Sequence, residues 1–115
     1  MLIGELGSDI IEEKIKVYKL INMYSNMNIT ISIDNNKIYG KSVINCYWAN
    51  CNIKDNSISL DMINTTRKTE SADKRKIEGN YLSILQTAYS FKIEDYKLII
   101  YTRFIDQPLI YEEIK

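Results

Sequence analysis

Few residues of this chain have the types and spacing that chemistry needs. The 115 residues include no histidine, so the usual general base at neutral pH, the Ser-His and Cys-His pairs and the commonest metal ligand are all missing. The two cysteines, Cys46 and Cys51, have no second Cys or His cluster beside them, so they do not indicate a structural zinc site. The sequence contains no Gly-rich phosphate loop and no Ser-x-x-Lys motif. We therefore predict no catalytic, metal-binding or cofactor-binding residues, and no enzymatic activity.

A local basic patch is the clearest charged feature. Residues 65–70 are rich in hydroxyls and charge, and Lys74, Arg75 and Lys76 follow at the start of a predicted helix. A helix N-terminus adds its own positive field. Two interpretations are open: a solvated loop and helix start, which we favour, or a patch that binds an anion or a partner.

Glu78 lies on the predicted helix, and no second carboxylate stands at a spacing that demands pairing. We therefore expect its side chain to hydrogen-bond the backbone near Asn45 or Thr66 rather than to act as an acid catalyst. Tyr47 and Trp48 are neighbours on one predicted strand, so their side chains point to opposite faces. One is expected in the core, and the other exposed or lining a groove.

Composition places the chain among ordinary globular proteins and excludes several function classes. It is 45% apolar and 26% charged, with fifteen basic residues balancing fifteen acidic ones. No global field therefore attracts nucleic acid or an anionic membrane. The length suits one domain over residues 1–115, with residues 1–14 as a loosely ordered extension. No stretch is long and apolar enough for a signal peptide or a transmembrane segment, which favours the cytoplasm for the chain as written.

Most of the chain alternates apolar and polar residues with a period of two, the pattern of half-buried strands. We predict hairpins with tight turns between them, from strands at residues 29–33 and 37–40, 43–53 and 57–62, 89–93 and 97–101, and a last strand at 109–113. Cys46 and Cys51 would then point to opposite strand faces. We therefore predict free thiols.

One helix is clear, over residues 72–88. Ser71 is its expected N-cap, and Gly79 within it should cost about 1 kcal/mol relative to alanine. Apolar residues recur on one face of this helix: Ile77, Tyr81, Ile84, Leu85 and Ala88. Residues 9–23 are ambiguous, because they suit either a helix capped by Asp9 or a strand.

Many short strands and one helix predict a mainly β fold, a small antiparallel β-barrel or strongly curved sheet with one α-helix packed against it. Tyr81, Ile84 and Leu85 should close a core made by the inward residues Ile31, Ile33, Ile38, Ile58, Leu60, Phe91, Ile93, Leu98 and Ile100. A slightly open barrel could hold an acyl chain or a small apolar ligand, whereas a filled one could not.

The order of these features resembles the META domain family, also described as HslJ-like. In that family a strand ending in Gly leads to an Asn followed by two aromatic residues, then to a Thr-Arg pair and a helix that carries a Glu. Here Gly40 closes the strand, and the resemblance spans residues 20–112. It implies a candidate structural or binding constellation formed by Asn45, Tyr47, Trp48, Thr66, Arg67 and Glu78.

The chain departs from the family pattern where the family has its cysteines. Val43 and Ile44 replace a Gly-Cys pair, Ala49 replaces a second Gly, and residues 68–70 replace Met-x-Cys. Any bridge made by relatives is impossible here. The resemblance also tips residues 15–23 toward a strand.

The family has no agreed biochemical activity, so the resemblance implies a theme rather than a reaction. It implies a non-enzymatic module, a monomer, that binds an unknown protein partner or an apolar ligand and supports cell-envelope integrity or the stress response, including heat shock. Relatives are often exported lipoproteins, so an envelope location is open beside the cytoplasmic one. The alternative is a cytoplasmic partner-binding regulatory protein, and an enzyme of unknown type comes third.

Overall fold

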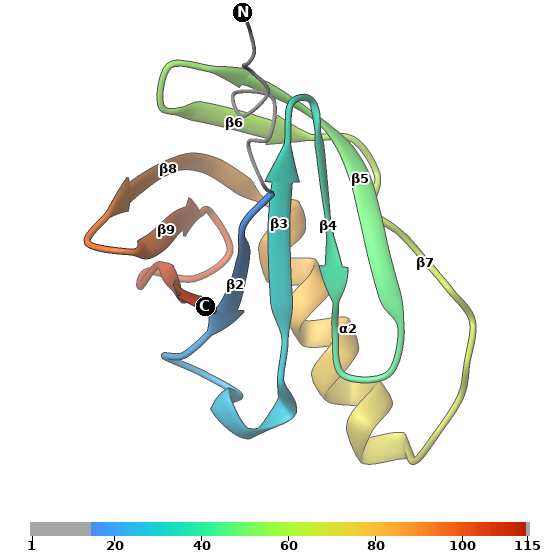
Figure 1. Ribbon diagram of the computed structural model, residues 1–115. Helices are drawn as coiled ribbons and strands as arrows, with labels where there is room; N and C mark the ends of the chain where they lie inside the picture. The colour runs from blue at the N-terminus through green and yellow to red at the C-terminus, as the bar shows by residue number, and fades with distance from the viewer. Residues whose placement is uncertain (1–14, 115) are drawn as a thin grey trace, which may run out of the picture.

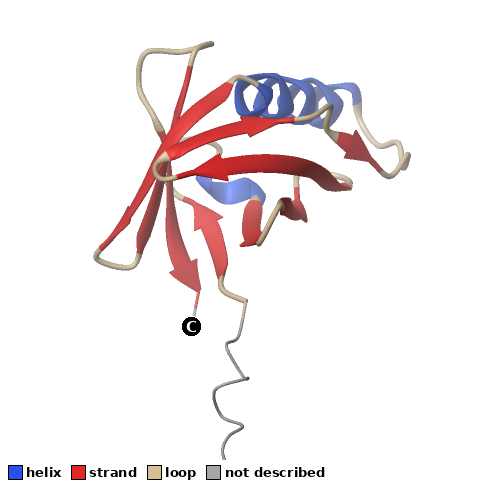
Figure 2. Ribbon diagram, turned by 90° about the horizontal axis from the view of Figure 1, so that it is seen from above, coloured by secondary structure: helices blue, strands red, loops and turns tan. Residues whose placement is uncertain are grey.

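The computed structural model describes residues 15–114, so the N-terminal extension and the expected Asp9 cap lie outside the described residues. Within this range the chain is mainly β, and eight antiparallel strands form a closed barrel with one α-helix (Figures 1 and 2). The barrel strands are β2 (Val17–Leu20), β3 (Thr30–Asp34), β4 (Lys37–Lys41), β5 (Cys46–Lys54), β6 (Ser57–Leu60), β8 (Ala88–Glu94), β9 (Lys97–Thr102) and β10 (Leu109–Ile114).

The ring of strands is closed unevenly. Its order is β4-β3-β2-β10-β9-β8-β6-β5, and β5 returns to pair with β4. The β4–β5 ladder runs from Lys37 opposite Asn50 to Lys41 opposite Cys46. By contrast, the ladder between β6 and β8 has one residue pair, Ser57 and Ser90, beside hydrogen bonds between Asn56 and Phe91. A ninth short strand, β7 (Asn64–Thr65), pairs with β5 alone and is therefore an edge strand.

The helix α2 (Ala72–Gln86) connects β7 to β8 and closes one end of the barrel (Figure 1). Ser71 caps it by accepting a hydrogen bond from the Lys74 backbone N–H. The buried helix residues Tyr81, Ile84 and Leu85 face the core, as the 3.6-residue period predicted. A short 3₁₀ helix, η1 (Ser25–Met27), lies between β2 and β3.

Side chains fill the barrel interior. Three fully buried tyrosines meet there, with the Tyr81 hydroxyl 2.9 Å from that of Tyr47 and 2.8 Å from that of Tyr111. The Tyr47 hydroxyl donates to the Thr30 carbonyl at 2.7 Å. Because a carbonyl can only accept, Tyr81 donates to Tyr47, and Tyr111 donates to Tyr81. Burial raises the pKa of all three hydroxyls, so they stay neutral.

Gly40 is required by a close approach of two strands. A Cβ atom at this position would lie 2.1 Å from the carbonyl oxygen of Thr30. The same carbonyl accepts the hydrogen bond from Tyr47. The Gly that closes this strand is therefore fixed by packing rather than by a positive φ.

The predicted hairpins and helix are confirmed, with several corrections at their ends. The strand predicted over residues 43–53 begins only at Cys46, because residues 42–45 form a turn. The strand predicted over residues 57–62 ends at Leu60, and α2 ends at Gln86, so that Ala88 already belongs to β8. Among residues 15–23, β2 confirms the strand interpretation. The short β7 was not predicted.

Most residues predicted to point inward are buried: Ile31, Ile38, Ile58, Leu98, Ile100, Tyr81, Ile84 and Leu85. Ile33, Leu60 and Phe91 are half-buried. The prediction for Ile93 is wrong, since its side chain is 55% exposed. Ile93 does pair with the buried Leu98, but it lies at the end of the barrel that the helix does not close.

Candidate functional site

The Glu78 carboxylate organises the turn between β4 and β5. Its Oε1 accepts hydrogen bonds from the Ser42 hydroxyl at 2.5 Å, the Ile44 backbone N–H at 2.7 Å and the Asn45 backbone N–H at 2.9 Å. Its Oε2 accepts from the Asn45 side-chain amide at 2.8 Å. The residue is only 8% exposed, so these donors replace water around the charge.

Asn45 carries the connection onward to the loop after β7. Its Oδ1 accepts from the Thr66 hydroxyl at 2.8 Å and from the Lys68 backbone N–H at 2.7 Å. The Thr66 hydroxyl oxygen also accepts from the Cys46 backbone N–H at 3.2 Å. Asn45, Thr66 and Glu78 therefore form one network that joins a turn, a loop and the helix.

The environment of Glu78 keeps it ionised. Burial by itself raises the pKa of its carboxyl, but the hydrogen bonds from Ser42, Asn45 and the Ile44 backbone outweigh burial and leave the pKa below its ordinary value. A general acid needs the opposite shift, toward a protonated group near neutral pH. The geometry therefore suits a structural anchor.

The other candidate residues do not join the network. Tyr47 is 1% exposed and belongs to the tyrosine chain of the core. Trp48 is 40% exposed on the outer face, opposite Tyr39 on β4. Arg67 is exposed and forms no ion pair within residues 15–114. Tyr47 and Trp48 thus occupy opposite faces, as strand alternation predicted.

The cysteines also lie on opposite faces of β5, Cys46 exposed and Cys51 buried, and both thiols are free. Burial raises the pKa of the Cys51 thiol. Sequence reasoning missed two polar residues that tie the structure together, Ser42 and Gln86. Each is a single polar residue near an element end, a signal too common to stand out.

The barrel end away from α2 forms an open hollow, here called the mouth. Its volume is about 740 Å³, and its apolar lining consists of Ile15, Val17, Ile33, Phe91, Ile93 and Ile114. The mouth also holds Glu113, whose carboxylate lies 3.8 Å from the Lys16 ammonium. It lies at the end where the β3–β4 and β8–β9 hairpins turn.

Two kinds of feature are absent from residues 15–114. This part of the chain has no group of three or more His, Cys, Asp or Glu residues that could hold a metal ion. It also has no helix long and apolar enough to cross a membrane.

A small β-barrel closed by one helix, with a buried Glu–Asn network at the junction, defines the structural class. The model of the META domain family matches residues 13–112. The chain therefore belongs to the META domain family.

One solved structure illustrates the shared fold. The protein from Burkholderia xenovorans, determined by NMR, is 15% identical and superimposes with a TM-score of 0.60 over 88% of this chain and 79% of that chain. At this identity the likeness shows the fold alone. None of the curated proteins compared with the chain matches it.

Proposed function

We propose that this META domain protein is a non-catalytic binding module and that an apolar segment of a partner protein docks at the mouth. The observation that carries the proposal is the apolar lining of the mouth, four of whose large side chains are exposed: Ile15, Val17, Ile93 and Ile114. Contiguous exposed apolar surface of this kind marks interaction sites in soluble proteins.

The filled interior favours a protein segment over an enclosed acyl chain. The tyrosine chain and the surrounding core residues lie inside the barrel, in the space that an enclosed alkyl chain would need. A wide, shallow hollow suits bulky side chains presented by a partner. Glu113 and Asp34 at the mouth add hydrogen-bond acceptors that orient a bound segment.

A non-catalytic role is supported by the one buried carboxylate of the junction. Glu78 already accepts four hydrogen bonds and has a lowered pKa, so it is poorly placed to take up or deliver a substrate proton. We further propose support of the cell envelope or the stress response, the theme of the family resemblance. A cytoplasmic regulatory role is the alternative. Fractionation of cells producing the protein from its natural gene separates these two.

Site-specific photo-crosslinking tests the docking site. A benzophenone amino acid replaces Ile93 at the mouth or, as a control, Phe104, which is 60% exposed near the opposite end of the barrel. We expect a discrete adduct in producing cells from position 93 only, and its loss when Val17→Glu is added. Equal adducts from both positions, or an adduct indifferent to Val17→Glu, would contradict the proposal.

A further inference from the structure

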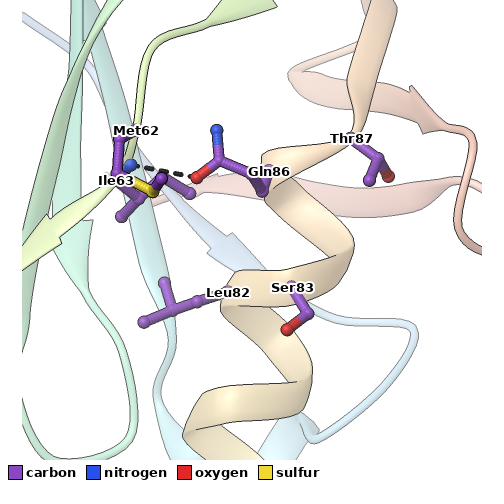
Figure 3. Close-up of a pocket in the computed structure, with 6 residues that line it drawn as sticks. All are labelled: Met62, Ile63, Leu82, Ser83, Gln86 and Thr87. Carbon is purple, nitrogen blue, oxygen red and sulfur yellow. Dashed lines mark hydrogen bonds between the residues drawn. The ribbon is translucent and has the colours of Figure 1, made fainter.

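A groove runs along the outer side of α2, between the helix and residues 62–69. It consists of two hollows that share Leu82. One has a volume of about 360 Å³ and is lined by Met62, Ile63, Leu82, Ser83, Gln86 and Thr87 (Figure 3). The other has a volume of about 290 Å³ and includes Thr66, Arg67, Lys68, Arg75 and Gly79. We call this surface the α2 groove.

The groove is held open by ties at its two ends. Gln86 accepts a hydrogen bond from the Ile63 backbone N–H at 2.9 Å and donates one to the Asp61 carbonyl at 2.9 Å. The Glu78–Asn45 network ties the other end. Positions 78, 82 and 86 lie on one helix face. Between the ties Gly79 leaves space, since a Cβ atom there would meet nothing within 4 Å.

One end of the groove carries an excess of positive charge. Arg67, Lys68 and Arg75 are exposed and make no ion pair in the described part of the chain, whereas the neighbouring Lys74 pairs with Glu70 at 3.0 Å. Glu78 adds one negative charge at this end, which its four neutral donors stabilise, so the lining keeps an excess of positive charge. Guanidinium groups suit carboxylates, which they bind through two parallel hydrogen bonds.

The other end is apolar. Met62 is 76% exposed, and Ile63 and Leu82 are half-buried beside it. In Figure 3 the side chains of Met62 and Ile63 lie on the strand side, and Leu82 extends toward that side from the helix. Methionine adapts its shape to different apolar partners. An apolar side chain from a ligand therefore finds contacts on both walls.

The backbone beside the groove favours a peptide as the occupant. The edge of β7 that does not pair with β5 has no strand beside it among residues 15–114. The Ile63 N–H points away from β5 and donates to Gln86. Because backbone groups alternate in direction along a strand, the N–H and C=O of Thr65 also point away from β5, toward the groove. Such an edge offers hydrogen bonds to an extended chain but not to a lipid tail.

We propose that the α2 groove binds an extended acidic peptide, with a carboxylate side chain against Arg67 and Arg75 and an apolar side chain against Met62 and Leu82. The helix rises about 16 Å between positions 75 and 86, which matches about five residues of extended chain. The ligand class is thus a short acidic segment with an apolar residue about four positions away. This surface differs in place and chemistry from the mouth.

Fluorescence anisotropy with labelled peptides tests the proposal. The probes are Glu-Asp-Ser-Gly-Leu-Leu and its reversed sequence, because the direction of binding is open, and a peptide with lysines in place of the acidic residues is the charge control. We expect an acidic probe to bind, Arg75→Gln and Met62→Ser each to weaken binding about threefold or more, and Lys76→Gln to change it little. Lys76 lies on the same helix but outside the groove, so Lys76→Gln removes the same charge without changing the lining of the groove.

A further variant separates blocked binding from misfolding. Gly79→Leu places a large side chain in the open space of the groove and also removes a poor helix former, so we expect full or higher thermal stability with loss of peptide binding. If Lys76→Gln weakened peptide binding as much as Arg75→Gln does, the effect would come from net charge alone and the proposed site would be wrong. Stronger binding of decyl phosphate, with displacement of the peptide, would make an anionic amphiphile the occupant and overturn the peptide proposal.

Discussion

The two ends of the barrel differ in what they leave in contact with water. At the helix end a buried charge and an irregular turn are matched by hydrogen bonds among three segments: the turn, the loop after β7 and the helix. At the mouth the strands simply stop, and apolar side chains such as Ile93 and Ile114 remain in contact with water. The Glu78–Asn45 network spends its hydrogen bonds within the fold, whereas the open end keeps apolar surface in contact with water. The comparison agrees with the two proposals made above, that the buried polar constellation serves the fold and that binding belongs to the surfaces left incomplete.

The largest effect is expected when the network at the helix end is broken. Glu78→Ala leaves the Ile44 and Asn45 backbone N–H groups without their acceptor, while the Ser42 hydroxyl and the Asn45 amide keep only the Asn45 and Lys68 carbonyls. Unsatisfied buried groups cost about 1–3 kcal/mol each, so we expect a loss of about 3 kcal/mol or more in the free energy of unfolding. Thermal melts should show a decrease of more than about 10 °C. Glu70→Ala, at an exposed carboxylate, is the control, and equal melting temperatures would contradict the structural role.

Next in size is the contrast between two glycines. Gly40→Ala forces a Cβ atom against the Thr30 carbonyl and should destabilise the protein by about 1–3 kcal/mol. Gly79→Ala meets open space and should stabilise it by about 0.5–1 kcal/mol. Urea denaturation of both variants measures the difference. Shifts of the same sign would show that the approach between β3 and β4 is not fixed.

A smaller effect is expected from acid. Because the Glu78 pKa in the folded state lies below its ordinary value of 4.5, its hydrogen bonds contribute fully above that pH, and this stabilisation is lost as the pH falls through the folded-state pKa. Stability measured from neutral pH down into this acid window should decrease less in Glu78→Gln than in the wild type. Parallel curves would show that another carboxylate governs the acid transition.

The smallest effect on folding is expected at the mouth. Ile93→Ala removes an exposed side chain and should change the free energy of unfolding by less than about 0.5 kcal/mol. Chemical denaturation measures it. A cost of 2 kcal/mol or more, about that of truncating a buried aliphatic residue, would mean that the mouth is covered, and the contrast between the two ends would fail.

The sequence predicted the fold well where local patterns decide it. Alternation located the hairpins because each strand buries one face, and the helix period located Tyr81 and Leu85. Alternation predicted which face of its strand Ile93 occupies but not how far its side chain is buried. Burial depends on where the strand extends beyond the core, which only the assembled barrel determines. Val43 and Ile44 extended the apolar pattern and hid the turn at residues 42–45.

The candidate site was less accessible to sequence reasoning. Asn45, Thr66 and Glu78 are far apart in the chain, so the resemblance to a family pattern grouped them and local periodicity did not. Ser42 and Gln86 act through hydrogen bonds whose partners are fixed only by tertiary structure. The α2 groove likewise arises from two ties and a glycine, which no local pattern records.

The single residue pair between β6 and β8 has a mechanical consequence. A closed barrel with one short ladder resembles a curved sheet whose two edge strands meet at that ladder. Opening that ladder at Ser57 and Ser90 would leave the β4–β5 ladder and the helix network intact, because neither crosses it. The shortest ladder of the barrel is thus separate from its hydrogen-bonded helix end, so a change in circumference at the β6–β8 junction would leave the Glu78–Asn45 network in place.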